Sequence, residues 1–161
     1  MCTGRYNFID GEPATRIFVA KLKEEAVIPT YAHIGDSGFS VCTPYGFTIW
    51  PLEYKLIKTG LAFMLPPGYE LQLRSRSGNT LKMGLVVAQG TATIDSNYRG
   101  EVGVIIYNRS SERHEIPAGY NICQGVIAPV PNVIIDEMDI KDFDETSRGD
   151  GAYGSTDRRT V

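Results

Sequence analysis

The sequence predicts an all-β protein built from short strands, and three observations support this fold class. The 161-residue chain contains 17 glycines and nine prolines, spread almost evenly, which divide it into segments too short for most helices. Several of these segments alternate apolar and polar residues, which is the period of a half-buried strand. Short strands separated by regular turn signals are typical of a sandwich, a barrel or a jelly roll.

The expected elements follow one another along the chain. The segment 16–22 is rich in β-forming residues, and the segment 54–65 is predicted to be one strand interrupted by a glycine. A Pro-Pro-Gly turn precedes the segment 69–74, whose odd-numbered residues are apolar. A short helical turn followed by a strand is expected within 81–88. Further strands are expected at 101–108, 121–130 and 132–138.

A change of composition near residue 139 sets the expected domain organisation. From this point the sequence becomes acidic and then glycine-rich, which is typical of an extended arm with a mobile tail. We expect an N-terminal extension at 1–15, a β domain at 16–138, and an arm with a glycine-rich tail at 139–161. Because such an arm has no core of its own, it is expected to pack on another subunit.

Composition limits the classes of partner. The formal net charge of −3 argues against the broad basic face of a nucleic-acid-binding protein. No apolar stretch approaches the length of a membrane span, and the N-terminal residues are polar, unlike those of a signal peptide. The three cysteines form neither a CxxC pair nor a disulfide framework. We therefore expect no nucleic-acid partner, no membrane and an intracellular location, in the cytoplasm or inside a host cell if the source is viral.

Polar residues at the end of a predicted strand form the first candidate site. Arg76, Ser77 and Gly78 follow the segment 69–74, where backbone N–H groups, a hydroxyl and a guanidinium can converge on one anion. The planar fork of an arginine suits phosphate because it binds two oxygens at once. The alternative is a Ser/Gly turn with solvated arginines.

Two further candidates lie later in the chain. Asp95 follows the apolar Ile94, and a carboxylate at a strand edge can orient a water or accept its proton. Tyr98 follows at a distance that lets its ring pack on a sugar. The alternative is a hairpin loop in which the polar residues stabilise the turn. Gln124 lies in an otherwise apolar strand, as either a ligand-facing amide or an edge residue bonded to backbone.

The segment 148–161 has the composition of a phosphate-binding loop. Arg148 precedes three closely spaced glycines, and a serine and a threonine follow them. A phosphate loop ordinarily leads into a helix whose N-terminus holds the anion, but no helix-forming segment follows here.

The order and spacing of these motifs resemble those of the trimeric dUTPase family. An RSG at a strand end is followed by IDxxYRG, by GxxIxQ and by a C-terminal RGxGxYGST, and the resemblance covers residues 34–156. The family's first motif corresponds to residues 37–41. The resemblance implies a β jelly-roll homotrimer with its active sites at subunit interfaces, which hydrolyses dUTP to dUMP and pyrophosphate with Mg²⁺.

The resemblance also implies roles for individual residues. Asp95 matches the carboxylate that orients the water attacking the α-phosphorus. Tyr98 matches the ring that packs on deoxyribose and excludes a 2′-hydroxyl. The other nucleotide-binding positions, which serve the phosphates, the base pocket and a mobile lid, are Arg76, Ser77, Gly78, Gln89, Thr93, Ile94, Gly103, Gln124, Arg148, Tyr153, Gly154, Ser155 and Thr156.

The sequence departs from the family pattern at several of these positions. The aspartate that holds metal-bound waters falls on Ser40, whose neutral hydroxyl cannot replace a carboxylate. Asp36 is the alternative metal ligand if the loop shifts, or else it caps a turn. Gln89 replaces an asparagine of the base pocket, and a side-chain amide can be turned to meet uracil or cytosine. The related dCTP deaminases need a glutamate at the position of Ile105, so deamination is not expected.

Two other functions compete with dUTP hydrolysis. One is pyrophosphate release from another pyrimidine deoxynucleoside triphosphate such as dCTP. The other is a non-enzymatic, nucleotide-binding regulatory protein on the same scaffold, with Ser40 marking the loss of metal binding. Pyrophosphate release measured on dUTP, dCTP, dTTP and UTP separates the three, because the regulatory protein binds nucleotide without turnover.

Overall fold

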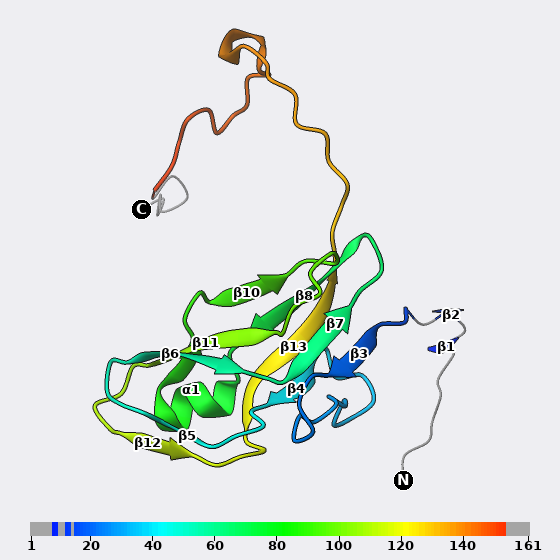
Figure 1. Ribbon diagram of the computed structural model, residues 1–161. Helices are drawn as coiled ribbons and strands as arrows, with labels where there is room; N and C mark the ends of the chain where they lie inside the picture. The colour runs from blue at the N-terminus through cyan, green and yellow to red at the C-terminus, as the bar shows by residue number, and fades with distance from the viewer. Residues whose placement is uncertain (1–7, 10–11, 14, 154–161) are drawn as a thin grey trace. The chain divides into compact units, whose positions relative to one another are not determined.

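The computed structural model describes residues 8–9, 12–13 and 15–153, and the chain divides between Pro131 and Asn132 into two units. We call the first unit the body and the second the arm. The regular secondary structure of the described part of the body consists of short strands and one short helix (Figure 1), which confirms the all-β prediction. Its elements are β1 (Phe8–Ile9), β2 (Glu12–Pro13), β3 (Phe18–Lys21), β4 (Phe39–Cys42), β5 (Phe47–Ile49), β6 (Tyr54–Lys58), β7 (Leu61–Met64), β8 (Tyr69–Arg74), α1 (Ser77–Met83), β9 (Leu85–Val87), β10 (Thr91–Ile94), β11 (Gly103–Asn108), β12 (His114–Ile116) and β13 (Asn121–Pro129).

The four-stranded sheet positions most of the candidate residues. Its strand order is β10-β8-β13-β4, and every neighbouring pair is antiparallel. A second sheet has the order β6-β11-β9, and β3–β7, β5–β12 and β1–β2 form two-stranded pairs. Segments far apart in sequence therefore lie side by side in the larger sheet (Figure 1).

The core follows from the alternation in the sequence. Leu71 and Leu73 of β8 are fully buried, and Val104 and Ile106 alternate in the same way along β11. Each fully buried side chain of this size stabilises the fold by about 1.5–3 kcal/mol relative to an exposed one. The two faces of these strands are thus fixed, and with them the directions in which the polar residues point.

The segment 54–65 is two strands and not one. Gly60 adopts a φ of +69°, which favours glycine, and a Cβ at this position would lie 2.8 Å from the Ala26 Cβ. The chain turns there, so β6 pairs with β11 and β7 pairs with β3. The predicted single strand is therefore wrong, because the glycine ends one strand and starts another.

The helical turn expected within 81–88 begins earlier, at Ser77, and ends where Gly84 takes a left-handed conformation with a φ of +67°. The strand β9 follows directly. The short strands β4, β5 and β12 fall in segments for which the sequence carried no strand prediction.

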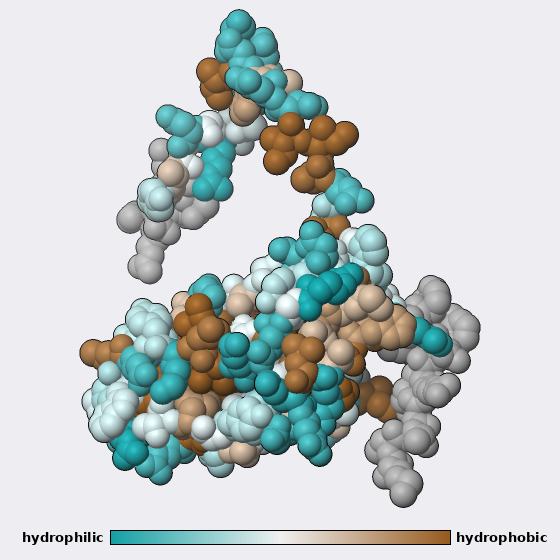
Figure 2. Space-filling view, viewed as in Figure 1, coloured by the Kyte–Doolittle hydropathy of each residue, from teal (hydrophilic) through white to brown (hydrophobic). Residues whose placement is uncertain are grey.

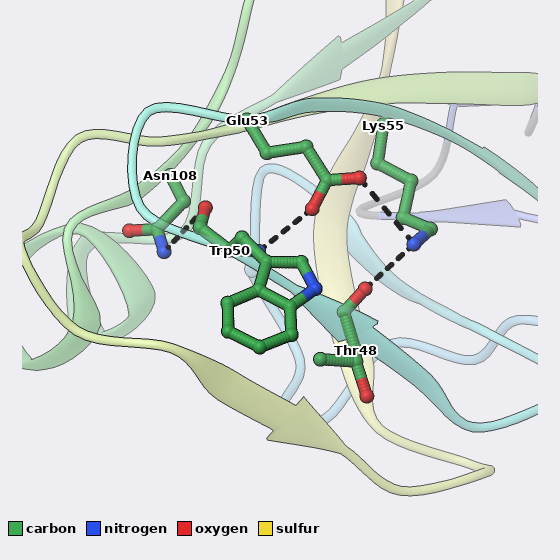
Figure 3. Close-up of polar contacts among 5 residues, drawn as sticks. All are labelled: Thr48, Trp50, Glu53, Lys55 and Asn108. Atoms are coloured by element: carbon green, nitrogen blue, oxygen red, sulfur yellow. Dashed lines mark hydrogen bonds and ion pairs between the residues drawn. The ribbon is translucent and has the colours of Figure 1, made fainter.

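A polar turn between β5 and β6 is held from several sides (Figure 3). The Trp50 backbone N–H donates to Glu53 Oε2 at 2.7 Å, and this hydrogen bond is the main reason that the pKa of the Glu53 carboxyl is lowered. Lys55 Nζ donates to the Thr48 carbonyl at 2.7 Å, and Asn108 Nδ2 donates to the Trp50 carbonyl at 3.0 Å. The turn is a structural element of the body.

The arm has little regular structure in its described part. It contains one 3₁₀ turn, η1 (Ile140–Asp142), capped by the Asp139 side chain. The strand predicted at 132–138 is absent, because no neighbouring strand pairs with this backbone within the described residues. Apolar side chains remain on its surface (brown in Figure 2), with Val133, Ile134 and Ile135 exposed by 75%, 89% and 92%. The predicted domain boundaries at 15 and 138 stay predictions.

Candidate functional site

The candidate phosphate-binding residues gather around the start of α1. Arg76 is the N-cap residue of this helix and is half-buried, while Ser77 and Gly78 form its exposed first turn. The Arg76 guanidinium donates from Nη1 to Ser40 Oγ at 2.6 Å. Ser40 lies on β4, so a residue distant in sequence anchors the arginine.

Strand register brings Gln124 to the same place. On β13, Gln124 lies opposite Ser40 of β4 on one side and opposite Arg74 of β8 on the other. A Cβ on Gly38 would lie 2.8 Å from both Gln124 Nε2 and the Gly125 backbone oxygen, so glycine lets the two segments approach closely. The sheet therefore places Ser40, Gln124 and the strand leading to Arg76 beside one another.

The charge at this cluster comes from Arg76. Within the described residues, no carboxylate forms an ion pair with it. The thiols of Cys42 and Cys123 lie close enough to Arg76 for its positive charge to affect their pKa. Burial raises the pKa of Cys42 and raises that of Cys123 to about 12, and in both cases Arg76 opposes the shift. The cluster thus carries a positive charge next to a neutral hydroxyl and an amide, an arrangement suited to an anion.

Asp95 lies at the far end of β10. It is exposed, immediately beyond Ile94, and its carbonyl accepts a hydrogen bond from the Tyr98 backbone N–H at 3.1 Å. The strand directs the carboxylate to the surface, where substrate and water can reach it. A carboxylate in this setting can hold and orient a water.

The Tyr98 ring is fixed over this turn. Its hydroxyl donates to the Glu101 carbonyl at 3.0 Å, and a Cβ on Gly100 would lie only 2.4 Å from the tyrosine oxygen. Glu101 in turn accepts from the Gly60 backbone N–H at 3.0 Å and pairs with Lys58 at 3.4 Å. The anchoring roles of Gly100 and Glu101 were not predicted, although the Arg-Gly-Glu run directly after Tyr98 was a visible signal.

The four predicted base-pocket positions lie before β10, on β10 and at the start of β11. Gln89 is exposed in a turn closed by a hydrogen bond from the Gly90 N–H to the Val87 carbonyl at 3.0 Å. Thr93 and Ile94 lie on β10, exposed and half-buried respectively. Gly103 opens β11 opposite Lys58, where a Cβ would lie 2.8 Å from Leu56 Cδ1. Ile105, on the same strand, brings no acidic group to the site.

One chain does not bring Asp95 and Arg76 together. In the antiparallel β8–β10 pair, Ile94 lies opposite Leu71, whereas Thr91 lies opposite Arg74. Asp95 therefore follows one end of the pair and Arg76 follows the other, with roughly 10 Å of strand between Leu71 and Arg74. The two residues therefore do not lie side by side within one chain.

The residues of the predicted lid lie in the arm. Arg148 is exposed and donates from Nε to the Gly151 carbonyl at 2.9 Å, and Gly149 has a φ of +54°. Tyr153 is fully exposed. The remaining predicted lid residues, Gly154, Ser155 and Thr156, lie outside the described residues.

The candidate metal ligands do not form a metal site in the described part of the chain. Asp36 Oδ2 accepts a hydrogen bond from the His33 backbone N–H at 2.9 Å, so it caps a turn. Ser40 is engaged by Arg76. No group of three or more histidine, cysteine, aspartate or glutamate residues within the described ranges is placed to hold a metal ion.

Among the residues that the structure describes, no helix is long and apolar enough to cross a membrane.

Comparisons with known proteins identify the family. A family model described as dUTPase matches residues 24–157. The deoxyuridine 5'-triphosphate nucleotidohydrolase of Wolinella succinogenes is 44% identical over 141 residues, which cover 88% of this chain and 93% of that protein. The enzyme of the same name from a Picosynechococcus strain is 46% identical over 136 residues, covering 84% of this chain and 94% of the other.

Solved structures give the same result. The dUTPase of Staphylococcus bacteriophage 80alpha, in a variant with bound dUpNHpp, superposes with a TM-score of 0.77 at 27% identity, covering 89% of this chain and 99% of that one. A dUTPase variant from phage phi11 of S. aureus, described with a structural Mg(II) ion, superposes with a TM-score of 0.73 at 27% identity. It covers 80% of this chain and 99% of its own.

Proposed function

This chain belongs to the dUTPase family, and from that premise we propose that it hydrolyses dUTP to dUMP and pyrophosphate by a water that Asp95 directs at the α-phosphorus. It is an enzyme of nucleotide metabolism, a dUTP diphosphatase. The observation that carries the assignment of roles is the exposed Asp95 carboxylate at the end of β10, beside a tyrosine ring locked over the same turn.

The Asp95 carboxylate accepts a hydrogen bond from the attacking water and holds the water's oxygen toward the phosphorus. The water's proton moves onto a carboxylate oxygen as the new P–O bond forms, and the bond from the α-phosphorus to the bridging oxygen breaks. Pyrophosphate leaves with that oxygen. Phosphoryl transfer needs mainly positioning and charge neutralisation, so a carboxylate exposed at the surface suffices.

Sugar and base are held by β10 and the segment that links it to β11. The Tyr98 ring packs on deoxyribose and leaves no space for a 2′-hydroxyl, and its bond to Glu101 keeps it there. Backbone groups of Thr93, Ile94 and Gly103 face the base. Because Gly103 has no side chain, the base can approach its backbone closely. Gln89 supplies an amide that can hydrogen-bond to uracil or, in the other orientation, to cytosine. For this reason dCTP is a second candidate substrate.

The phosphates are held by residues of other segments. Arg76, Ser77, Gly78 and Gln124 supply a guanidinium, a hydroxyl, backbone N–H groups and an amide for the triphosphate. From the arm, Arg148 pairs with the γ-phosphate and Tyr153 covers the base, while the glycine-rich 149–156 segment closes as a lid with Ser155 and Thr156 on the phosphate oxygens.

The working form is a homotrimer. Asp95 and Arg76 follow opposite ends of the β8–β10 pair, and this separation favours a site that takes the two residues from different copies. In the arm, the exposed side chains of Val133, Ile134 and Ile135 form an apolar segment that another copy would cover. Each active site then combines the Asp95 turn of one subunit, the Arg76 cluster of the next and the arm of a third.

Mg²⁺ is the cofactor, and one chain's residues do not fit a cage for it. The hydroxyl of Ser40 already accepts from a guanidinium, and Asp36 caps its own turn. When bound, the ion would take its ligands chiefly from the triphosphate and would supply charge neutralisation there. Because deoxynucleoside triphosphates are made and used inside cells, we propose an intracellular location.

Pyrophosphate release from dUTP, dCTP, dTTP and UTP tests the proposal. Wild-type protein should prefer dUTP, and turnover of none of the four would overturn the function. Asp95→Asn should lower kcat by about 10³-fold, since it removes the group that takes the proton. A non-hydrolysable dUTP analogue should still bind that variant, and a wild-type rate would remove Asp95 from the mechanism.

A further inference from the structure

We propose that Ser40 is a positioning residue that orients the Arg76 guanidinium toward the nucleotide phosphates, and that this pair takes the place of a protein-held metal at this corner of the site. The inference rests on the proposed function. The observation that carries it is the hydrogen bond from Arg76 Nη1 to Ser40 Oγ at 2.6 Å.

The hydroxyl is attached to a rigid element. Phe39 and Val41 of β4 point into the core, so Ser40 between them points to the other face of the strand. The pairing of Ser40 on β4 with Gln124 on β13 fixes the position of Ser40 along the sheet. An anchor of this kind holds one end of a side chain that otherwise has many rotamers.

Anchoring leaves the guanidinium able to bind phosphate. An arginine has five N–H donors in a planar fork, and no other hydrogen bond of the Arg76 side chain occurs within the described residues. Four donors therefore remain for phosphate oxygens. Because less freedom is lost when the nucleotide binds, the anchor favours tighter binding.

The neutrality of Ser40 matters as much as its position. A carboxylate at this place would form an ion pair with Arg76 and occupy the donors that the phosphates need. A hydroxyl accepts one bond and leaves the positive charge unpaired, as it is in the described residues. A cation is disfavoured next to this guanidinium, so Mg²⁺ gains no protein ligand here.

Three substitutions at one position test the proposal. Ser40→Ala should weaken binding of a non-hydrolysable dUTP analogue and raise KM roughly 10-fold, with kcat changed less than about twofold. Ser40→Thr should restore wild-type values, since it keeps the hydroxyl. Ser40→Asp should weaken binding in EDTA, and added Mg²⁺ should recover part of it, whereas the wild-type affinity should change little when Mg²⁺ is added.

A double-mutant cycle shows whether Ser40 acts through Arg76. In an Arg76→Ala background, Ser40→Ala should have no further effect on the affinity for the analogue or for inorganic tripolyphosphate. Additive losses, an equal loss in Ser40→Thr, or wild-type affinity in Ser40→Ala would overturn the positioning role. Thermal melting of each variant identifies losses that come from unfolding.

The two proposals fail in different ways. Absence of dUTP turnover in the wild-type protein contradicts the proposed function, but the tripolyphosphate cycle still decides whether Ser40 positions Arg76. Normal turnover with an unaltered Ser40→Ala variant contradicts the positioning role alone.

Discussion

The Asp95 turn and the arm carry residues of one predicted reaction, yet they are held in different ways. Around Asp95, the strand β10, the Tyr98–Glu101 hydrogen bond and the Glu101–Gly60 contact fix the backbone within one chain. In the arm, local contacts such as Arg148 to Gly151 accompany apolar side chains that stay exposed. The turn is complete in one copy, whereas the arm requires something to cover it.

The largest effect is expected from a charge on the arm's apolar segment. Ile135→Asp should abolish the trimer and with it nearly all turnover, because a carboxylate buried without a partner costs several kcal/mol. Sedimentation velocity and pyrophosphate release measure the two effects. Ile34→Asp is the matched control, because Ile34 in the body is the same residue type with the same exposed fraction of 92%. A trimer that survives Ile135→Asp would show that this segment is not an interface.

Removing the lid should separate catalysis from assembly. A chain ending at Ser147 lacks Arg148 and the glycine-rich segment, so turnover should fall roughly 100-fold as the γ-phosphate loses its partner and the site stays open. The trimer should persist, since residues 133–135 remain. Full activity of the shortened chain would mean that the tail has no part in the reaction.

How much the sequence predicted differs in the same way between the two regions. Alternation in β8 and β11 predicted the body's strands because their partners lie within the same chain. The same apolar signal at 132–138 predicted a strand that the described chain does not form, since it offers no neighbouring strand. An apolar pattern indicates that a segment is buried in the assembled protein, but it does not indicate which chain buries it.

The site shows a second limit of sequence reasoning. The motifs and their spacing singled out Arg76, Asp95 and Tyr98 as candidates, because each lies at the end of a strand or in a tight turn, and their roles stay predictions. The bond between Ser40 and Arg76 could not be predicted, since it depends on the register of β4 against β13. The contact of Gly100 with the Tyr98 ring likewise depends on the path of the loop.

A smaller effect is expected from crowding the Asp95 turn. Gly100→Ala places a methyl group against the Tyr98 ring, so the ring must shift, and kcat/KM for dUTP should fall about 10-fold. Discrimination against UTP should fall with it. Tyr98→Phe keeps the ring and removes only its bond to Glu101, and should stay within about threefold of wild type. If the Gly100→Ala variant discriminates against UTP as strongly as the wild-type protein does, the proposed role of the Tyr98 ring is contradicted.

The smallest effect concerns a thiol of the body. Burial raises the pKa of Cys123 to about 12, so the reactive thiolate is nearly absent at pH 8. Iodoacetamide should leave Cys123 unmodified in the native protein and alkylate it in guanidinium chloride, as peptide mass spectrometry can show. Rapid native alkylation would mean that the β13 region opens as readily as the arm.

Whether one site combines residues of different copies can be measured directly. Chains carrying Asp95→Asn and chains carrying Arg76→Ala, each with its own tag, are co-expressed, and trimers that hold both tags are isolated. In a closed ring of three, one site then pairs an intact Asp95 with an intact Arg76 from the next subunit, so turnover should recover to about one third of wild type. Mixed trimers no more active than the two parent proteins would contradict an active site shared between subunits.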